Sequence, residues 1–140
     1  MKTLLFALFL SIFSINTFAQ NLVGRWQLQS TNYAITTQNG KTKDSFNHVK
    51  EKGVNITWEF QNNGKLITKD GTNTVIGTWT LKGNQLNLKG DWAKLIAETF
   101  GQPDLIYEVE FIGNTIKLSV DATKLSNYKR NILTYTYLKL

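Results

Sequence analysis

The chain contains no cysteine, one proline and one histidine among its 140 residues. Without cysteine, no disulfide can hold the fold together, and a zinc site of the usual Cys and His type cannot be assembled. The scarcity of proline and the lack of low-complexity sequence leave no candidate for a linker between domains. We therefore expect one domain, stabilised by packing and hydrogen bonds, with no metal and no cofactor.

The sequence also has no block of clustered positive charge, although its net charge is +6. Its Lys residues are scattered along the chain. Nucleic-acid-binding domains typically concentrate basic residues on one stripe or in a recognisable module. We therefore expect no nucleic-acid partner, although the excess charge is suited to steering anionic partners.

A long hydrophobic run occurs at the start of the chain, in MKTLLFALFLSIFSINTFAQ at 1–20. Lys2 precedes an apolar stretch from Leu4 to Ile15, and the small residue Ala19 follows before Gln20. This layout is typical of a secretory signal peptide, and the stretch is shorter than the roughly 20 residues that span a bilayer. We predict cleavage after Ala19 and a mature domain at 20–140. A membrane anchor or a buried helix is the alternative interpretation.

The predicted cleavage site is not followed by a cysteine, so no lipid can be attached to such a residue there. No later run is apolar enough to span a membrane. We therefore expect a soluble, monomeric protein in the periplasm or outside the cell, without stable membrane insertion.

Beyond residue 20, apolar and polar residues alternate, and turn signals recur about every 8–12 residues, as in all-β sandwiches and barrels. The pairs Asn63-Gly64, Gly83-Asn84 and Gly113-Asn114 favour the positive φ angles of tight hairpins. Consecutive hairpins make an up-and-down antiparallel meander, and about eight such strands can close into a barrel without a free edge. The predicted strands are 24–31, 55–60, 65–70, 74–81, 85–89, 105–112, 115–120 and 131–139.

Residues 32–54 form the first of two long connections in this pattern. Loops longer than about 12–15 residues are uncommon in compact domains and are often functional lids. Phe46 and Val49 stand at helical spacing, which favours a short helical turn within this predicted loop.

The second long connection, DWAKLIAETFGQP at 91–103, predicts one short amphipathic helix between the fifth and sixth strands. Asp91 is the expected N-cap, and Gly101 and Pro103 end the helix. The helix must lay its apolar side on the mouth or the outer wall of the barrel. That side consists of Trp92, Leu95, Ile96 and Phe100.

A Gly-x-Trp motif, Gly24 to Trp26, stands at the start of the first strand within LVGRWQL at 22–28. Together with WEFQNNGKL at 58–66, GTWTLKGNQLNL at 77–88 and YTYLKL at 135–140, it resembles the lipocalin (calycin) superfamily. The closest likeness is to the short lipocalin-like domains of exported bacterial proteins. It covers nearly all of the predicted mature chain.

The resemblance implies a barrel with one closed end and one open mouth, in which Trp26 plugs the closed end. It also implies a cation over this tryptophan, near the end of the last strand. Arg130 stands at the opposite end of that strand, so Lys139 is the better-placed cation, although a Lys stacks less well than an Arg.

An eight-stranded barrel is wide enough either to be filled by side chains or to hold one small ligand. Both interpretations fit the residues that the alternation points inward. These candidates for a cavity lining are Trp58, Phe60, Val75, Trp79, Leu86, Leu88, Tyr107, Val109, Phe111, Ile116, Leu118 and Tyr135.

Polar groups for such a cavity are available from three hydroxyls, those of Tyr107, Tyr135 and Tyr137. The inward face of the last strand stays open at this point. Either the face with Ile132 and Leu138 or the face with Leu133, Tyr135 and Tyr137 points to the interior.

Candidates for catalysis are few. His48 lies in the 32–54 segment with no cysteine or second histidine to partner it, which is typical of a solvated loop histidine. Glu108 and Glu110 share one face of a strand, and they alternate with apolar residues as a wet face does. We therefore expect no enzyme. Some barrels of the superfamily are isomerases or synthases, but no constellation here supports that alternative.

The sequence thus favours a secreted, lipocalin-like protein that encloses one small, mostly hydrophobic, lipid-like molecule. The alternative hypothesis is a protein-binding or inhibitory module. In that case the 32–54 loop makes the contact and a filled barrel serves as its scaffold.

Overall fold

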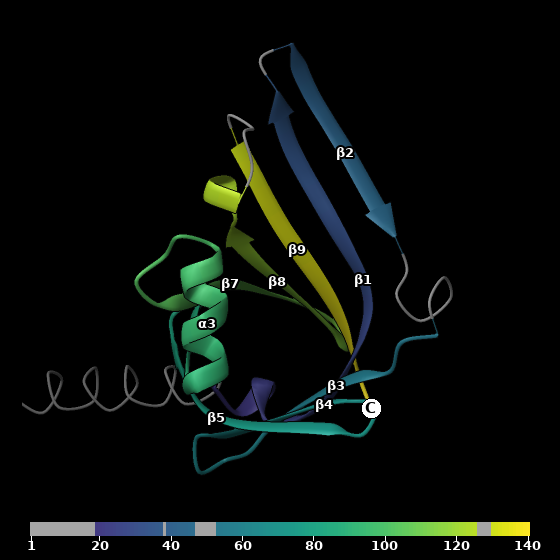
Figure 1. The fold of residues 1–140 in the computed structure, drawn as a ribbon. Coiled ribbons are helices and arrows are strands. Elements are labelled where there is room, and N and C mark those ends of the chain that lie inside the picture. Colours follow the sequence, from purple (N-terminus) through teal and green to yellow (C-terminus); the bar gives the residue numbers. More distant parts are fainter. Residues whose placement is uncertain (1–18, 38, 47–52, 126–129) are drawn as a thin grey trace, which may run out of the picture.

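The computed structural model describes residues 19–37, 39–46, 53–125 and 130–140. His48, Val49 and almost all of the predicted signal peptide lie outside these ranges. A helical turn at 19–22 precedes the first strand. Then follow β1 (Gly24–Thr37), β2 (Gly40–Phe46), β3 (Ile56–Phe60), β4 (Lys65–Asp70), β5 (Asn73–Lys82), β6 (Gln85–Lys89), α3 (Asp91–Thr99), β7 (Leu105–Ile112), β8 (Thr115–Asp121), the 3-10 helix η1 (Thr123–Leu125) and β9 (Arg130–Lys139), as Figure 1 shows.

Eight of these strands form a closed antiparallel barrel, as the sequence predicted. The sheet runs in the order β2-β1-β3-β4-β5-β6-β7-β8-β9, and a further pairing of β1 with β9 closes it. Each barrel strand therefore pairs with its chain neighbours, as an up-and-down meander requires. The helix α3 lies between β6 and β7, which are the fifth and sixth strands of the barrel, and this prediction is confirmed.

The prediction of a loop over 32–54 is wrong for the first part of this segment. Strand β1 extends to Thr37, and the chain then turns back and forms β2 beside it. Phe46, expected in a helical turn, is the last residue of β2 and pairs with Thr31. The physical reason is a bulge between Leu28 and Ser30. A bulge inserts one residue and reverses the inward and outward alternation, which hides the continuing strand in the sequence pattern.

The long strand β1 has different partners along its two halves. Gly24–Gln27 pair with β3, whereas Thr31–Thr37 pair with β2. Figure 1 shows the far half of β1 rising with β2 and β9, away from β3, β4 and β5. The barrel is therefore closed by β3 near the start of β1 and open farther along.

The closed end is built around Trp26, which is buried. Its Nε1 donates a hydrogen bond of 2.8 Å to the carbonyl oxygen of Leu22, and the Lys139 Nζ lies 5.3 Å from the centroid of its ring. Of the two cations weighed from the sequence, Lys139 is thus the one over the tryptophan. Gly24 has φ +140, and a Cβ there would lie 3.1 Å from the Lys139 Cε. A glycine fits here because it tolerates the positive φ angle and because it has no Cβ to crowd the Lys139 side chain.

The inward face of β9 is decided by the structure. Leu133 and Tyr137 are buried and Tyr135 is half-buried against the core, whereas Ile132 and Leu138 stand on the other face. The remaining interior is packed with large apolar side chains. Those that are fully or almost fully buried include Leu22, Phe60, Leu66, Leu86, Leu88, Leu105, Ile116 and Leu118.

Candidate functional site

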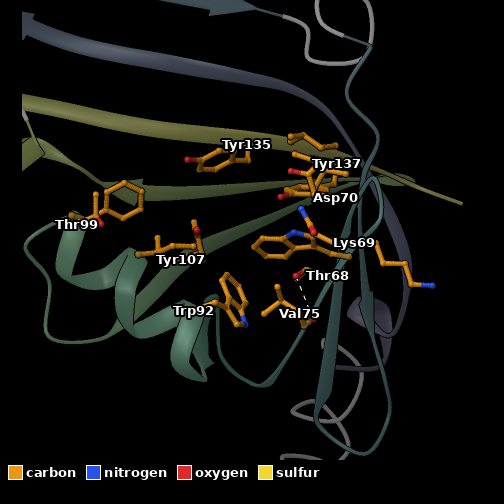
Figure 2. A pocket seen from close by; sticks show the side chains of 15 residues that line it. Thr68, Lys69, Asp70, Val75, Trp92, Thr99, Tyr107, Tyr135 and Tyr137 are labelled. Carbon is orange, nitrogen blue, oxygen red and sulfur yellow. Dashed lines mark hydrogen bonds between the residues drawn. The ribbon is translucent and has the colours of Figure 1, made fainter.

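A cavity of about 390 Å³ lies between α3 and the inner face of the barrel (Figure 2). Its lining is mostly apolar and aromatic, with a few polar residues. The lining residues are Leu28, Ile56, Trp58, Thr68, Lys69, Asp70, Asn73, Val75, Trp92, Ile96, Thr99, Phe100, Tyr107, Tyr135 and Tyr137.

The helix α3 covers this cavity and rests on the barrel through small residues. Ala93 and Ala97 are its buried residues, and their short side chains allow close approach to the strands. Leu95, expected on the apolar side, is 65% exposed and faces solvent, so that part of the prediction is wrong. The expected N-cap is also displaced by one residue. Gly90 is the N-cap, and no side chain caps the helix.

The start of α3 is seated by Trp92, whose indole lies against bare backbone at Gly77 of β5. A Cβ added at Gly77 would lie 2.9 Å from the Trp92 Nε1 and 2.5 Å from the Lys89 carbonyl oxygen. The absence of a side chain at Gly77 therefore makes room for this ring. Within the described residues, the Trp92 Nε1 is buried without a hydrogen-bond partner.

The end of α3 is tied to the opposite wall of the barrel. The Lys124 Nζ, in η1, donates a hydrogen bond of 3.0 Å to the carbonyl oxygen of Gly101. The Gln102 Nε2 lies 3.4 Å from the carbonyl oxygen of Asp121, at the end of β8. The helix is thus held at both ends, so the cavity beneath it has a fixed roof.

Six aromatic residues line the cavity, and Trp58 is central among them. Its ring centroid lies 5.9 Å from that of Trp92, 6.1 Å from that of Tyr107 and 5.1 Å from that of Tyr137. The rings of Tyr107 and Tyr135 meet edge to face at 6.2 Å. Such tilted and edge-to-face pairs are the favoured arrangements of aromatic side chains, so the rings support one another in place.

The hydroxyls of Tyr107, Tyr135 and Tyr137 are the principal polar groups of the interior. Among the described residues, no group forms a hydrogen bond with any of them. Burial raises the pKa of Tyr135 to about 12 and raises the pKa of Tyr107 and Tyr137 well above 10.0. The second cause is repulsion from a neighbouring tyrosine, which is Tyr33 for Tyr135 and a member of the three for Tyr107 and Tyr137. All three therefore stay neutral O–H donors at physiological pH.

Charged residues occur only at the rim of the described cavity. Lys69 and Asp70 are both exposed, and Figure 2 shows the Lys69 side chain pointing away from the tyrosines. Thr68 also lines the rim, and its Oγ1 lies 3.4 Å from the carbonyl oxygen of Val75. The inner part of the cavity is consequently aromatic and uncharged.

The residues proposed from the sequence for the cavity separate into two groups. Trp58, Val75, Tyr107 and Tyr135 line it. The others contribute to the packed interior without reaching the cavity, and Phe111 among them is only half-buried. These are Phe60, Trp79, Leu86, Leu88, Val109, Phe111, Ile116 and Leu118.

Several lining residues were not proposed as such from the sequence. Trp92, Ile96 and Phe100 were placed on the apolar side of the helix, and that pattern was the available signal for them. Tyr137 was proposed only as a hydroxyl donor. The rest carry no sequence signal, because pairing and hairpin position bring them together. They are Leu28, Thr68, Lys69, Asp70, Asn73 and Thr99. Ile56 is different, because alternation in the predicted strand 55–60 puts it on the same face as Trp58.

Catalytic or metal-binding groupings are not found in the part of the chain that the structure describes. No three His, Cys, Asp or Glu residues there are placed to hold a metal ion. Glu108 is exposed and accepts a hydrogen bond of 3.3 Å from the Asn84 Nδ2, and Glu110 is exposed on the same face. Of the helices in the described ranges, none has both the length and the apolar character needed to cross a bilayer.

No protein-family model and no curated protein sequence matches the chain. The comparison with solved structures finds a match to the crystal structure of a protein of unknown function from the DUF3598 family of Nostoc punctiforme PCC 73102. The two share 14% sequence identity with a TM-score of 0.35, over 87% of this chain. The chain spans about half of that protein's length, with 49% of it covered.

Proposed function

We propose that this protein binds one small, mostly apolar molecule in the cavity under α3, in the manner of a lipocalin-like barrel. The observation that carries the proposal is the cavity itself, with about 390 Å³ of space bordered by six aromatic rings. Ligand sites are typically concave, about 300–1,000 Å³ in volume, and mostly apolar with a few placed polar groups. The cavity meets each of these criteria.

The contrast with the rest of the barrel supports this proposal. Around Phe60, Leu66 and Leu118 the described interior is packed, and each of these side chains is at most 1% exposed. Protein interiors are normally packed as densely as organic crystals, so a cavity of this size in a small barrel needs an explanation. An apolar ligand that fills it would gain burial energy of about 25 cal/mol per Å² of apolar surface.

The alternative of a protein contact through 32–54 changes its form, because 32–37 and 40–46 form a paired hairpin and 47–52 lie outside the described residues. An enzyme lacks a supporting arrangement in the described residues. The proposal therefore remains a binding protein. It also includes export after cleavage at Ala19, which the mass of the protein recovered from its native host would test.

Two neighbouring residues of β5 offer a matched test of the site. Val75 lines the cavity and is 38% exposed, whereas Ile76 is 56% exposed and points to the opposite face, as successive strand residues do. Val75→Phe places a ring in the mouth of the cavity, and Ile76→Phe adds the same ring outside. The probe is the neutral fluorophore N-phenyl-1-naphthylamine, titrated into each purified protein.

We expect the wild type and Ile76→Phe to bind the probe with the same Kd, and Val75→Phe to bind it at least about 10-fold more weakly, a change equivalent to about 1.4 kcal/mol. Circular dichroism melting checks that both variants fold. Equal binding by Val75→Phe would place the site elsewhere. If the wild type binds no probe and native mass spectrometry finds no bound small molecule, the proposed function is wrong.

A further inference from the structure

We infer that the ligand carries an uncharged hydrogen-bond acceptor, such as a carbonyl, ether or hydroxyl oxygen, at the end that lies among Tyr107, Tyr135 and Tyr137. This inference rests on the proposed function and specifies the chemistry of its ligand. The three residues, referred to below as the tyrosine cluster, come from β7 and β9.

The tyrosine cluster is held by regular strands. Strand β8 runs between β7 and β9, and its Leu118 and Ile116 pair with Tyr135 and Tyr137. Both β8 side chains are fully buried, so the tyrosine rings stand in front of an apolar wall. Figure 2 shows Tyr107, Tyr135 and Tyr137 facing the same space between the strands and α3. Groups fixed on strands are positioned more precisely than groups on loops, as a binding site requires.

The hydroxyls of this cluster lack partners in the described structure. Tyr107 and Tyr137 are each only 3% exposed, and no hydrogen bond joins either hydroxyl to another described residue. Their oxygens are not among the fully enclosed atoms without a partner, so they border the open space of the cavity. Buried polar groups are nearly always hydrogen-bonded, because an unpaired donor is costly to bury. An acceptor on the ligand would satisfy them. Burial also keeps these phenols protonated, so each has a proton to donate.

A negatively charged head group fits this site poorly. Lys69 is the one cation among the lining residues, and it stands exposed on β4 and points away from the cluster. A carboxylate among the tyrosines would therefore lose its hydration without gaining an opposite charge.

A positively charged head group is attracted by aromatic faces, and the cavity has several. A quaternary ammonium, however, has no lone pair to accept from the hydroxyls, which would stay unpaired. The one acid in the lining, Asp70, stands exposed at the end of β4 and not beside the cluster. A neutral acceptor is the head group that meets all of these conditions.

Three probes with the same ten-carbon chain separate the possibilities: 1-decanol, decanoate and decyltrimethylammonium. Each is titrated, below its micelle concentration, against the protein loaded with N-phenyl-1-naphthylamine. The proteins are the wild type, Tyr107→Phe and Tyr137→Phe, which remove a hydroxyl and keep the ring. The binding of the fluorophore itself reports whether each variant retains its cavity.

We expect 1-decanol to be the tightest of the three for the wild type. Each Tyr→Phe change should weaken 1-decanol by about 2- to 12-fold, as the loss of one hydrogen bond would, and change the other two less than about 2-fold. Tightest binding by decanoate or decyltrimethylammonium, or equal weakening of all three probes, would overturn the inference and leave the proposed function standing. If neither the fluorophore nor any probe binds the wild type, both fall together.

Discussion

Two parts of the barrel interior, the closed end around Trp26 and the cavity end around Trp58 and Trp92, use tryptophan in opposite ways. At the closed end, Trp26 is buried, its Nε1 donates to the Leu22 carbonyl oxygen, and Lys139 lies over its ring. At the cavity end, Trp58 and Trp92 meet at 5.9 Å and border open space, and the Trp92 Nε1 has no hydrogen-bond partner in the described structure.

This contrast separates a packed part of the barrel from a part that holds an open, aromatic cavity. At the closed end the polar atom of the tryptophan is paired and its ring is packed, as a stable core demands. At the cavity end, the Trp92 Nε1 has no hydrogen-bond partner among the described residues, and several aromatic rings border open space. Such local departures from complete packing and pairing are expected at functional sites.

Truncation of the two tryptophans should give the largest effect. We expect Trp26→Ala to lower the free energy of unfolding by about 3–5 kcal/mol, the usual cost for a buried tryptophan. Trp58→Ala should cost less, because one side of its ring already borders the cavity and fewer contacts are lost. Urea denaturation of both variants measures the difference. A larger loss for Trp58→Ala would contradict the assignment of stability to the closed end.

The next largest effect is expected at Gly77, where the roof of the cavity meets β5. Gly77→Ala places a methyl group 2.9 Å from the Trp92 Nε1 and 2.5 Å from the Lys89 carbonyl oxygen, so Trp92 or the strand must move. We expect a loss of about 1–3 kcal/mol, as for overpacked cores, together with weaker binding of N-phenyl-1-naphthylamine.

Gly83→Ala is a control for added bulk at a glycine, since nothing lies within 4 Å of a Cβ there. Its φ of +61 makes some loss of stability expected, but probe binding should not change. Unchanged probe binding by Gly77→Ala would mean that Trp92 does not shape the cavity.

The tyrosine cluster should make the stability of the cavity end depend on alkaline pH. Burial raises the pKa of Tyr135 from 10.0 to about 12 and raises those of Tyr107 and Tyr137, so the unfolded chain loses these protons first. The stability that the three neutral tyrosines contribute to the folded state is fully present below about pH 10. Above it the unfolded state binds fewer protons, and the free energy of unfolding falls by up to about 1.4 kcal/mol per pH unit for each tyrosine.

Urea denaturation between about pH 9 and pH 11 measures this slope against the ordinary tyrosine value of about 10. Tyr137→Phe should show a shallower decline than the wild type, because one of the titrating groups is gone. Identical slopes would mean that Tyr137 ionises as readily in the folded chain as in the unfolded one.

The smallest effect is expected for the cation at the closed end. Lys139 is exposed, and its Nζ lies 5.3 Å from the centroid of the Trp26 ring. Lys139→Met keeps much of the chain length and removes the charge, so we expect a loss of about 0.5–1 kcal/mol, typical of an exposed cation–π contact. Lys117→Met, on the outer face of β8, is the matched control, and the two melting curves should differ by this amount.

The sequence predicted the strands best where the alternation was unbroken. All eight barrel strands and the helix at Asp91–Thr99 were placed within a few residues, except for the far half of β1. There the bulge after Leu28 changes which residues point inward, so that Thr31 and Tyr33 take the inward positions. The alternation of apolar and polar residues is interrupted at such a bulge and does not reveal the rest of the strand. For the same reason, the sequence did not predict the hairpin of β1 with β2.

The cavity was predictable only in part. Alternation indicated which residues point inward, but it could not separate the filled section around Phe60 and Leu118 from the open section around Trp58 and Tyr107. That difference depends on where α3 rests and on how far β3 follows β1. Both are contacts between segments distant in sequence.

By itself, the sequence determined the antiparallel meander and its tight turns, because each depends on local periodicity or on the backbone freedom of glycine. The place of Trp26 at the closed end was implied only by the family resemblance of its Gly-x-Trp motif. Only the tertiary structure decided which face of β9 points inward, where the cavity lies and which tyrosines share it. These features arise when strands far apart in the chain pair in register, and a one-residue change in that register moves every side chain to the other face.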